Sequence, residues 1–217
     1  ACAVRCKREV KVNDRYQVSS AYGGPEYEAI GGFGSNCGID DLQAIAKANE
    51  LCGRYTLDAI STSSVVAFAM ECFEHGLITA RDTAGLDLRF GNADAMLKLV
   101  DMIAHRQGLG HLLADGVRRA AEVIGGDARR FALHVKGQEL PMHDPRGKVG
   151  VGFAYAISET GAEHLSAYHD SMMANPNSVM FKSVAPLGIT EPLPPRELSA
   201  RKANMYATLE NWSSLGK

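Results

Sequence analysis

The first residues in the chain that could do chemistry are two cysteines, Cys2 and Cys6, with three residues between them. Thiolates bind iron–sulfur clusters through short loops of this kind, because the backbone must bend so that neighbouring sulfurs reach different irons. Two thiolates alone cannot hold a four-iron cluster, and two ordinary thiols would show the same spacing. The spacing therefore leaves both interpretations open, a metal-binding pair and a pair of free thiols.

Carboxylates and imidazoles that could handle protons occur in two regions. Glu26 and Glu28 flank Tyr27 after a Gly-Pro pair, and an extended backbone would point both carboxylates to one face. Such a pair beside an apolar tract can raise one pKa and yield a proton donor, whereas a solvated acidic turn has no such role. The second region holds four histidines and two glutamates: His134, His143, His164, His169, Glu159 and Glu163. Together they are a candidate acid/base or metal site, although each histidine alone could be structural.

The turn Asp144-Pro-Arg-Gly147 presents a carboxylate and a guanidinium. It could hold a phosphate, or it could lock two segments through an internal ion pair. Nucleotide-binding loops are not indicated, because Gly31-Gly-Phe-Gly34 matches neither the Rossmann nor the Walker pattern.

Helices predominate among the elements expected to position these residues. Apolar spacing, capping residues and glycine stops predict helices over about 40–53, 61–75, 92–108, 111–124 and 194–212. The sequence predicts a short strand from Arg130 to Val135 and a loop or short strand over residues 1–22. Residues 154–162 could form a further helix. The predicted fold class is therefore predominantly α with one or two short strands. Two domains are expected, residues 1–127 and 128–217.

Composition disfavours two classes of partner, nucleic acids and membranes. The formal net charge is -2, and the most apolar stretch, Val65 to Met70, is far too short to span a bilayer. Five cysteines without a secretory signal indicate a reducing compartment, so we expect a cytoplasmic protein. The 217 residues open on Ala1 instead of Met and stop at Lys217, and we expect a segment of a longer polypeptide.

Six motifs, taken in order, resemble the helical middle and C-terminal portions of the tungsten-pterin aldehyde ferredoxin oxidoreductases. They are Gly23-Gly-Pro-Glu-Tyr-Glu28, Asn36-Cys-Gly-Ile-Asp-Asp-Leu42, Ala48-Asn-Glu-Leu-Cys52, Leu57-Asp-Ala-Ile-Ser-Thr62, Phe68-Ala-Met-Glu71 and Leu140-Pro-Met-His-Asp-Pro-Arg-Gly147. The resemblance runs from Cys2 to at least His169, and it implies helical domains of the aldehyde ferredoxin oxidoreductase type.

The resemblance implies a metal role for the cysteine pair. In that family a Cys-x-x-Cys-x-x-x-Cys loop supplies three ligands to a four-iron cluster, and a distant C-terminal cysteine supplies the fourth. Cys2 and Cys6 match the second and third ligands, so this chain would hold half of the set. The Glu-x-x-His iron site of one family member falls on Lys47 and Glu50, and we expect no iron there.

The resemblance also implies catalytic and pterin-binding residues. The family's active-site glutamate and histidine fall on Glu28 and His164, as a proton-handling carboxylate and a donor to the substrate oxygen. Leu57 and Asp58 match the end of the first pterin motif, whose earlier Asp and Gly are replaced here. The Asp144–Arg146 turn is a further candidate for contact with the pterin edge: both residues are expected to bind cofactor.

The activity that the resemblance implies is oxidation of an aldehyde, or another small carbonyl compound, to a carboxylic acid. The cofactors would be a tungsten (or molybdenum) bis-pterin and one 4Fe-4S cluster, with ferredoxin or an electron-transfer subunit as acceptor. Because the domain that covers the pterin with a sheet is missing, we expect this chain alone to bind no cofactor and to be inactive. A homodimer is the oligomeric state to test.

Two alternatives stay open at this point. One is the catalytic subunit of a tungsten benzoyl-CoA reductase-like complex, for which His143 could supply a second imidazole. The other is a non-catalytic helical scaffold or interaction module, in which Glu28, Asp58 and His164 would have no common role.

Overall fold

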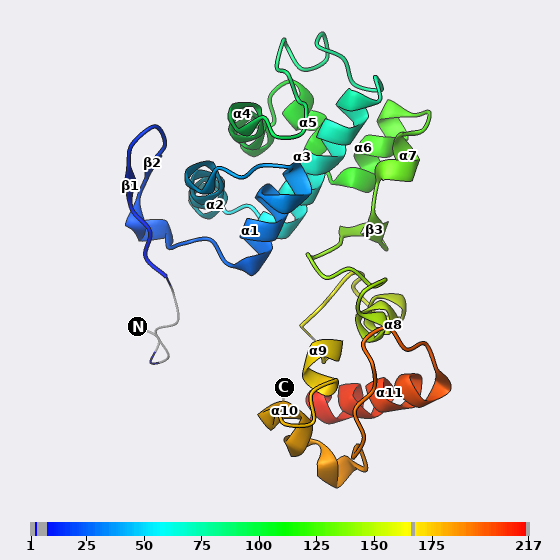
Figure 1. The fold of residues 1–217 in the computed structure, drawn as a ribbon. Coiled ribbons are helices and arrows are strands. Elements are labelled where there is room, and N and C mark those ends of the chain that lie inside the picture. Colours follow the sequence, from blue (N-terminus) through cyan, green and yellow to red (C-terminus); the bar gives the residue numbers. More distant parts are fainter. Residues whose placement is uncertain (1–2, 4–7, 166–167, 216–217) are drawn as a thin grey trace. The chain divides into compact units, whose positions relative to one another are not determined.

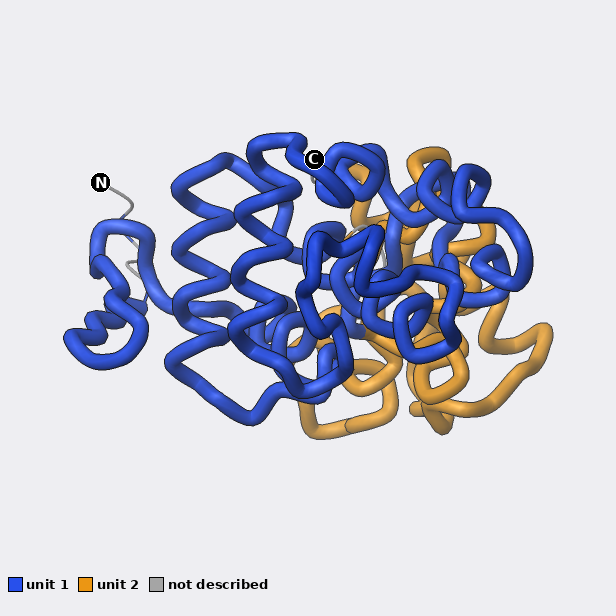
Figure 2. Tube along the Cα trace, turned by 90° about the horizontal axis from the view of Figure 1, so that it is seen from above, with its two compact units in different colours: residues 1–142 blue, residues 143–217 orange. Residues whose placement is uncertain are grey.

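The structure, a computed structural model, describes residues 3, 8–165 and 168–215. The chain forms two compact units, residues 1–142 and 143–217, which Figure 2 shows in different colours. Helices predominate in both units, and the strands form two short antiparallel hairpins. The predicted fold class is therefore confirmed.

The first unit is a group of helices packed around α3 (Figure 1). Its elements in chain order are β1 (Val12–Asn13), β2 (Gln17–Val18), η1 (Ser20–Tyr22), α1 (Tyr27–Phe33), η2 (Ser35–Cys37), α2 (Leu42–Tyr55), α3 (Ala59–Glu74), α4 (Ala93–Ala104), α5 (Leu109–Leu113), α6 (Val117–Ile124), α7 (Ala128–Phe131), β3 (His134–Val135) and β4 (Gln138–Glu139). Seven of the eight residues from Val65 to Cys72 in α3 are buried. A helix that is apolar all round is stable only with neighbours on every side, and α1, α2, α4, α6 and α7 all contact α3.

Side-chain caps set the starts of the three long helices of this unit. The carboxylate of Asp41 accepts from the amides of Gln43 and Ala44 at the start of α2, and Asn92 caps α4. The predicted start of the next helix at Ser61 is wrong. α3 begins at Ala59, two residues earlier than expected, because Asp58 caps it: Oδ1 of Asp58 accepts from the Ser61 amide at 2.7 Å.

Two other predicted elements differ in the structure. The helix expected over 111–124 is two helices, α5 and α6, because Gly116 has a φ of +87° and interrupts the helical backbone. The strand expected from Arg130 to Val135 is wrong for its first half. Phe131 lies in the helical turn α7 with its ring stacked on that of His75, so only His134 and Val135 remain to pair with β4.

A buried carboxylate joins α2 to the β1–β2 hairpin. Glu50 is almost fully buried, and it accepts from Lys47 at 2.9 Å and from Arg54 at 2.6 Å. Lys47 also donates to the carbonyl of Gln17 in β2 at 2.8 Å. The N-terminal hairpin is thereby held on one side of α2.

The second unit contains α8 (Val149–Ile157), α9 (Asp170–Met173), α10 (Val179–Ser183), η3 (Ala185–Leu187) and α11 (Ala200–Ser214). The predicted start of its last helix near Pro194 is wrong, because Ser199 caps α11. The core of this unit is small: Met173, Phe181, Val184, Leu193, Met205, Tyr206 and Leu209.

A buried ion pair adds to this small core. Lys202 in α11 lies 2.8 Å from Asp170 at the start of α9, with both side chains inaccessible to solvent. Asp170 also accepts from the amides of Gly150 and Val151 in the first turn of α8. One carboxylate therefore connects three helices of the unit.

The sequence-based domain boundary after residue 127 stays a prediction, and the contacts divide the chain later, after Met142. The β3–β4 hairpin belongs to the first unit because Glu139 reaches back to accept from the amide of Val117 at 2.8 Å, which caps α6. Among the residues that the structure describes, none of the helices combines the length and the apolar character needed to cross a bilayer.

Candidate functional site

The carboxylate of Glu28 lies in the first turn of α1 and is held by the last residues of the first unit. Its Oε2 accepts from the amide of Met142 at 2.7 Å, and the hydroxyl of Tyr27 donates to the Met142 carbonyl at 2.9 Å. Gly31 makes room for this segment, because a Cβ there would lie 2.9 Å from Cγ of Met142. A backbone amide thus fixes the orientation of the candidate catalytic carboxylate.

The expected pairing of Glu26 with Glu28 on one extended face is wrong. Glu26 is the N-cap residue of α1 and Glu28 is its second residue, and successive residues of a helix point about 100° apart. The carboxylate of Glu26 is exposed and pairs with Arg8 at 2.6 Å. The two glutamates therefore face different surroundings.

Three of the four histidines from the predicted region come together within the second unit. The ring centroid of His143 lies 5.0 Å from that of His164 and 4.4 Å from that of His169. A ring nitrogen of His169 lies 3.2 Å from the carbonyl oxygen of His164. His134 belongs to β3 in the first unit, where its Nδ1 accepts from the amide of Gly137.

His143 is the most enclosed member of this histidine cluster, which comprises His143, His164 and His169. Its side chain is 9% exposed, and its Nδ1 lies 3.1 Å from Nζ of Lys148. Burial, followed by the positive charge of Lys148 and the neighbouring imidazoles, lowers the pKa of His143 to about 4. Burial also lowers the pKa of His169. His143 is therefore neutral at neutral pH.

The two glutamates of the same region, Glu159 and Glu163, follow α8. Glu159 is exposed, and Glu163 accepts from the amide of Leu165 at 2.7 Å in the loop after α8.

The Asp144–Arg146 turn forms an internal ion pair. Nε of Arg146 lies 3.1 Å from both carboxylate oxygens of Asp144, and a terminal guanidinium nitrogen lies 2.7 Å from Oδ2. The hydrogen bonds from Arg146 lower the pKa of Asp144. The pair closes its own turn and does not lock two distant segments, and both side chains remain exposed. A cofactor-binding role for Asp144 and Arg146 stays a prediction.

Leu57 and Asp58 lie in the connection between α2 and α3. Leu57 packs partly buried against the core, while Asp58 is exposed and uses Oδ1 to cap α3. Within the described part of the chain, Oδ2 of Asp58 has no hydrogen-bond donor. An exposed carboxylate oxygen fixed by a helix cap fits contact with ring N–H groups such as those of a pterin. Cys2 and Cys6 lie outside the described residues.

Sequence reasoning missed the Met142 amide at Glu28 and the ammonium of Lys148 at His143. The first contact joins residues that are 114 positions apart, so no local pattern could indicate it. The second had one signal, because the Asp-Pro-Arg-Gly turn between His143 and Lys148 reverses the chain.

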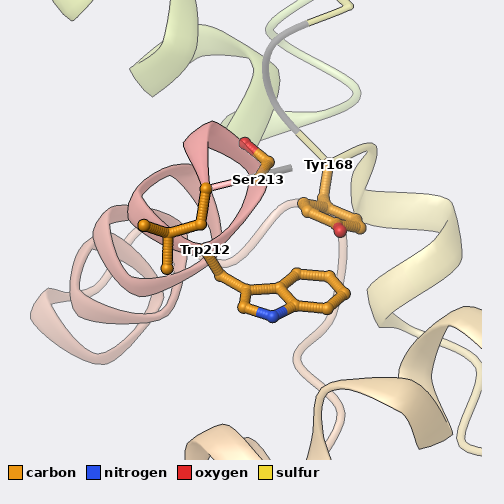
Figure 3. A pocket seen from close by; sticks show the side chains of 4 residues that line it. Tyr168, Trp212 and Ser213 are labelled. Carbon is orange, nitrogen blue, oxygen red and sulfur yellow. The ribbon is translucent and has the colours of Figure 1, made fainter. Parts of the chain in front are cut away.

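An open pocket with a volume of about 390 Å³ lies elsewhere in the second unit (Figure 3). It is lined by Tyr168, Trp212, Ser213 and Leu215, and the rings of Tyr168 and Trp212 stack with centroids 5.9 Å apart. None of the described residues predicted for the site lines it.

Comparison of the sequence with known protein families identifies the family of this chain. The family model described as "Aldehyde ferredoxin oxidoreductase, domains 2 & 3" matches residues 1–216. The chain belongs to the aldehyde ferredoxin oxidoreductase family. This membership confirms the resemblance that the six motifs indicated.

The most similar curated relatives include two tungsten-containing aldehyde ferredoxin oxidoreductases. The enzyme from Thermococcus kodakarensis is 35% identical over 216 residues, which cover 99% of this chain and 33% of the relative. The enzyme from Pyrococcus abyssi is also 35% identical, with the same coverage. A relative from Pyrococcus furiosus, the WOR-like subunit of an aliphatic sulfonate oxidoreductase, is 32% identical over 76% of this chain. The chain spans about a third of the length of the aldehyde oxidoreductases that it matches.

A solved structure is also similar to this member of the aldehyde ferredoxin oxidoreductase family. It is the active-site complex BamBC of benzoyl coenzyme A reductase with 1,5-dienoyl-CoA. The similarity has a TM-score of 0.53 and 27% identity, and it covers 62% of this chain and 20% of that chain.

Proposed function

We propose that this chain supplies the helical part of a tungsten (or molybdenum) bis-pterin, iron–sulfur oxidoreductase. The enzyme oxidises aldehydes to carboxylic acids, uses ferredoxin or an electron-transfer subunit as acceptor, and works in the cytoplasm. The observation that carries the proposal is the family match over residues 1–216, joined to identities of 34–35% with enzymes of that name. The chain spans a third of the length of those enzymes, so we propose that it supplies only some of the residues that the reaction needs.

Glu28 and His164 are the proposed catalytic residues. The carboxylate of Glu28 accepts or returns a proton, and the Met142 amide keeps it from rotating away from the orientation that proton transfer needs. The imidazole of His164, packed against His143, donates to the carbonyl oxygen of the substrate and orients it. Each role uses a side chain whose position other residues fix.

The cofactor contacts are also proposed from the family match. When bound, the tungsten-pterin group supplies a two-electron acceptor and the cluster supplies a one-electron carrier. Asp58, with Leu57 beside it, and the Asp144–Arg146 turn would hold the pterin. Cys2 and Cys6 would be two of the four cluster ligands.

Metal content tests this function directly. In the native protein that carries this chain we expect tungsten or molybdenum, pterin and about four irons per chain. We also expect reduction of ferredoxin or a viologen dye when aldehydes are added. The 217-residue chain assayed alone should contain none of these cofactors. A native protein without metal would overturn the proposal and favour a helical scaffold.

A second reaction is favoured by one observation, the 27% identity to the benzoyl coenzyme A reductase complex at a TM-score of 0.53. Parallel assays separate the two reactions. Aldehyde-dependent dye reduction supports the first function. Activity only with an aromatic thioester of coenzyme A would replace it with the second.

A further inference from the structure

The side chain of Lys148 makes a contact that the proposed function leaves unused. Lys148 precedes the first residue of α8, and its Nζ lies 3.1 Å from Nδ1 of His143. An ammonium group can donate hydrogen bonds and cannot accept them. Nδ1 is therefore the acceptor, and a neutral His143 carries its ring proton on Nε2.

The position of His143 is fixed at a second point. The hydroxyl of Tyr155, on α8, donates to the backbone carbonyl of His143 at 3.1 Å. Lys148 and Tyr155 therefore hold the ring and the backbone of His143 from the start and the last turn of one helix. With its side chain only 9% exposed, His143 has little freedom to turn.

His164 packs against this fixed ring. The two ring centroids lie 5.0 Å apart, and a ring nitrogen of His169 lies 3.2 Å from the carbonyl oxygen of His164. Which nitrogen of an imidazole carries the proton is set by the polar groups that its two nitrogens face. The tautomer of His143 thus bears on which atom of His164 can donate.

We propose that Lys148 and His143 form a positioning pair for His164. Lys148 holds His143 in the tautomer with its proton on Nε2, and His143 holds the imidazole of His164 in one orientation. The catalytic value of that orientation rests on the proposed function, whereas the pair itself is a property of the second unit. His143 acts through His164, without contact with substrate.

The tautomer of His143 is the first test. Long-range ¹H–¹⁵N spectra of the ¹⁵N-histidine-labelled chain distinguish protonated from unprotonated ring nitrogens, and the His143→Gln variant assigns the signals. We expect Nδ1 to be unprotonated and Nε2 protonated. Lys148→Met should give a mixture of tautomers, Lys148→Arg should restore the single form, and Lys182→Met, at an exposed lysine of α10, should change nothing. A protonated Nδ1 in the unmodified chain, or an unchanged tautomer in Lys148→Met, would overturn the pair.

The effect on His164 is the second test. His143→Leu removes both ring nitrogens, whereas the amide nitrogen of His143→Gln stands near the place of Nε2. We expect the ring signals of His164 to shift toward a tautomer average in His143→Leu and to stay close to the original in His143→Gln. If the role of His143 were purely structural, the ring signals of His164 would shift equally in both variants, which would contradict the inference. Unchanged ring signals of His164 in His143→Leu would also contradict it.

Both measurements use the chain without cofactors, so they are independent of the metal assay. A metal-free native protein would overturn the proposed function and leave a confirmed tautomer standing. If His143 instead carries its proton on Nδ1, the positioning pair is overturned, whereas the metal and aldehyde assays can still support the proposed function.

Discussion

The carboxylate of Glu28 is oriented by one backbone amide, that of Met142. Glu28→Gln keeps an oxygen that can accept this hydrogen bond and removes the proton-handling group. We expect kcat for aldehyde oxidation by the native protein to fall by about 10²- to 10⁴-fold, with little change in thermal stability. Glu26→Gln is the matched control, because Glu26 is exposed and two residues away. Full activity in Glu28→Gln would remove Glu28 from the catalytic machinery.

The pKa of His143 predicts a pH dependence of stability. Its pKa lies near 4 in the folded chain, below the ordinary value of 6.5, so only the unfolded state binds this proton between those values. The contribution of neutral His143 to the free energy of unfolding is therefore complete above pH 6.5. It is lost as the pH falls toward 4, and the total loss is about 3 kcal/mol. Urea unfolding at neutral and mildly acidic pH measures it. His143→Gln should flatten the profile and His111→Gln, at an exposed histidine, should not; equal slopes in all three chains would contradict the prediction.

Among the elements, α1 and α3 approach each other closely at a glycine. A Cβ on Gly32 would lie 2.0 Å from Oγ of Ser63 and 2.7 Å from its Cβ, so one of the two helices must move to admit a methyl group. We expect Gly32→Ala to destabilise the chain by about 1–3 kcal/mol in chemical unfolding. Gly53→Ala is the helical control, because Gly53 is exposed in α2 and the nearest atom to its Cβ would be Cδ1 of Tyr22, at 3.2 Å. Equal stability of the two variants would mean that α1 and α3 pack differently.

The second unit relies on a polar contact between elements because its apolar core is small. Lys202→Met would leave the carboxylate of Asp170 buried without its cation, and we expect a loss of about 3–5 kcal/mol. Trp212, the one tryptophan of the chain, lies in α11 and reports unfolding of this unit by fluorescence. Adding Asp170→Asn to Lys202→Met should recover part of the loss, while Lys182→Met should cost little. A full-stability Lys202→Met variant would show that the ion pair does not support the unit.

At the scale of the whole molecule, local patterns predicted the helices better than the contacts that join them. Asp41 and Asn92 cap helices where their side-chain chemistry indicated, and the apolar run of α3 became the centre of the first unit. Arg130 to Val135 misled because Phe131 finds its partner, His75, across the fold and not along a strand. Glu28 and His164 follow from the family resemblance, whereas the contacts of Met142 with Glu28 and of Asp170 with Lys202 depend on tertiary approach.

The ion pairs around Glu50 also have a consequence for how permanently the N-terminal hairpin is held. The ammonium of Lys47 lies 2.9 Å from the buried carboxylate of Glu50. This counterion is covalently part of the chain, so neither a chelator nor dilution can remove it. The attachment of the β1–β2 hairpin to α2 therefore does not depend on a dissociable counterion.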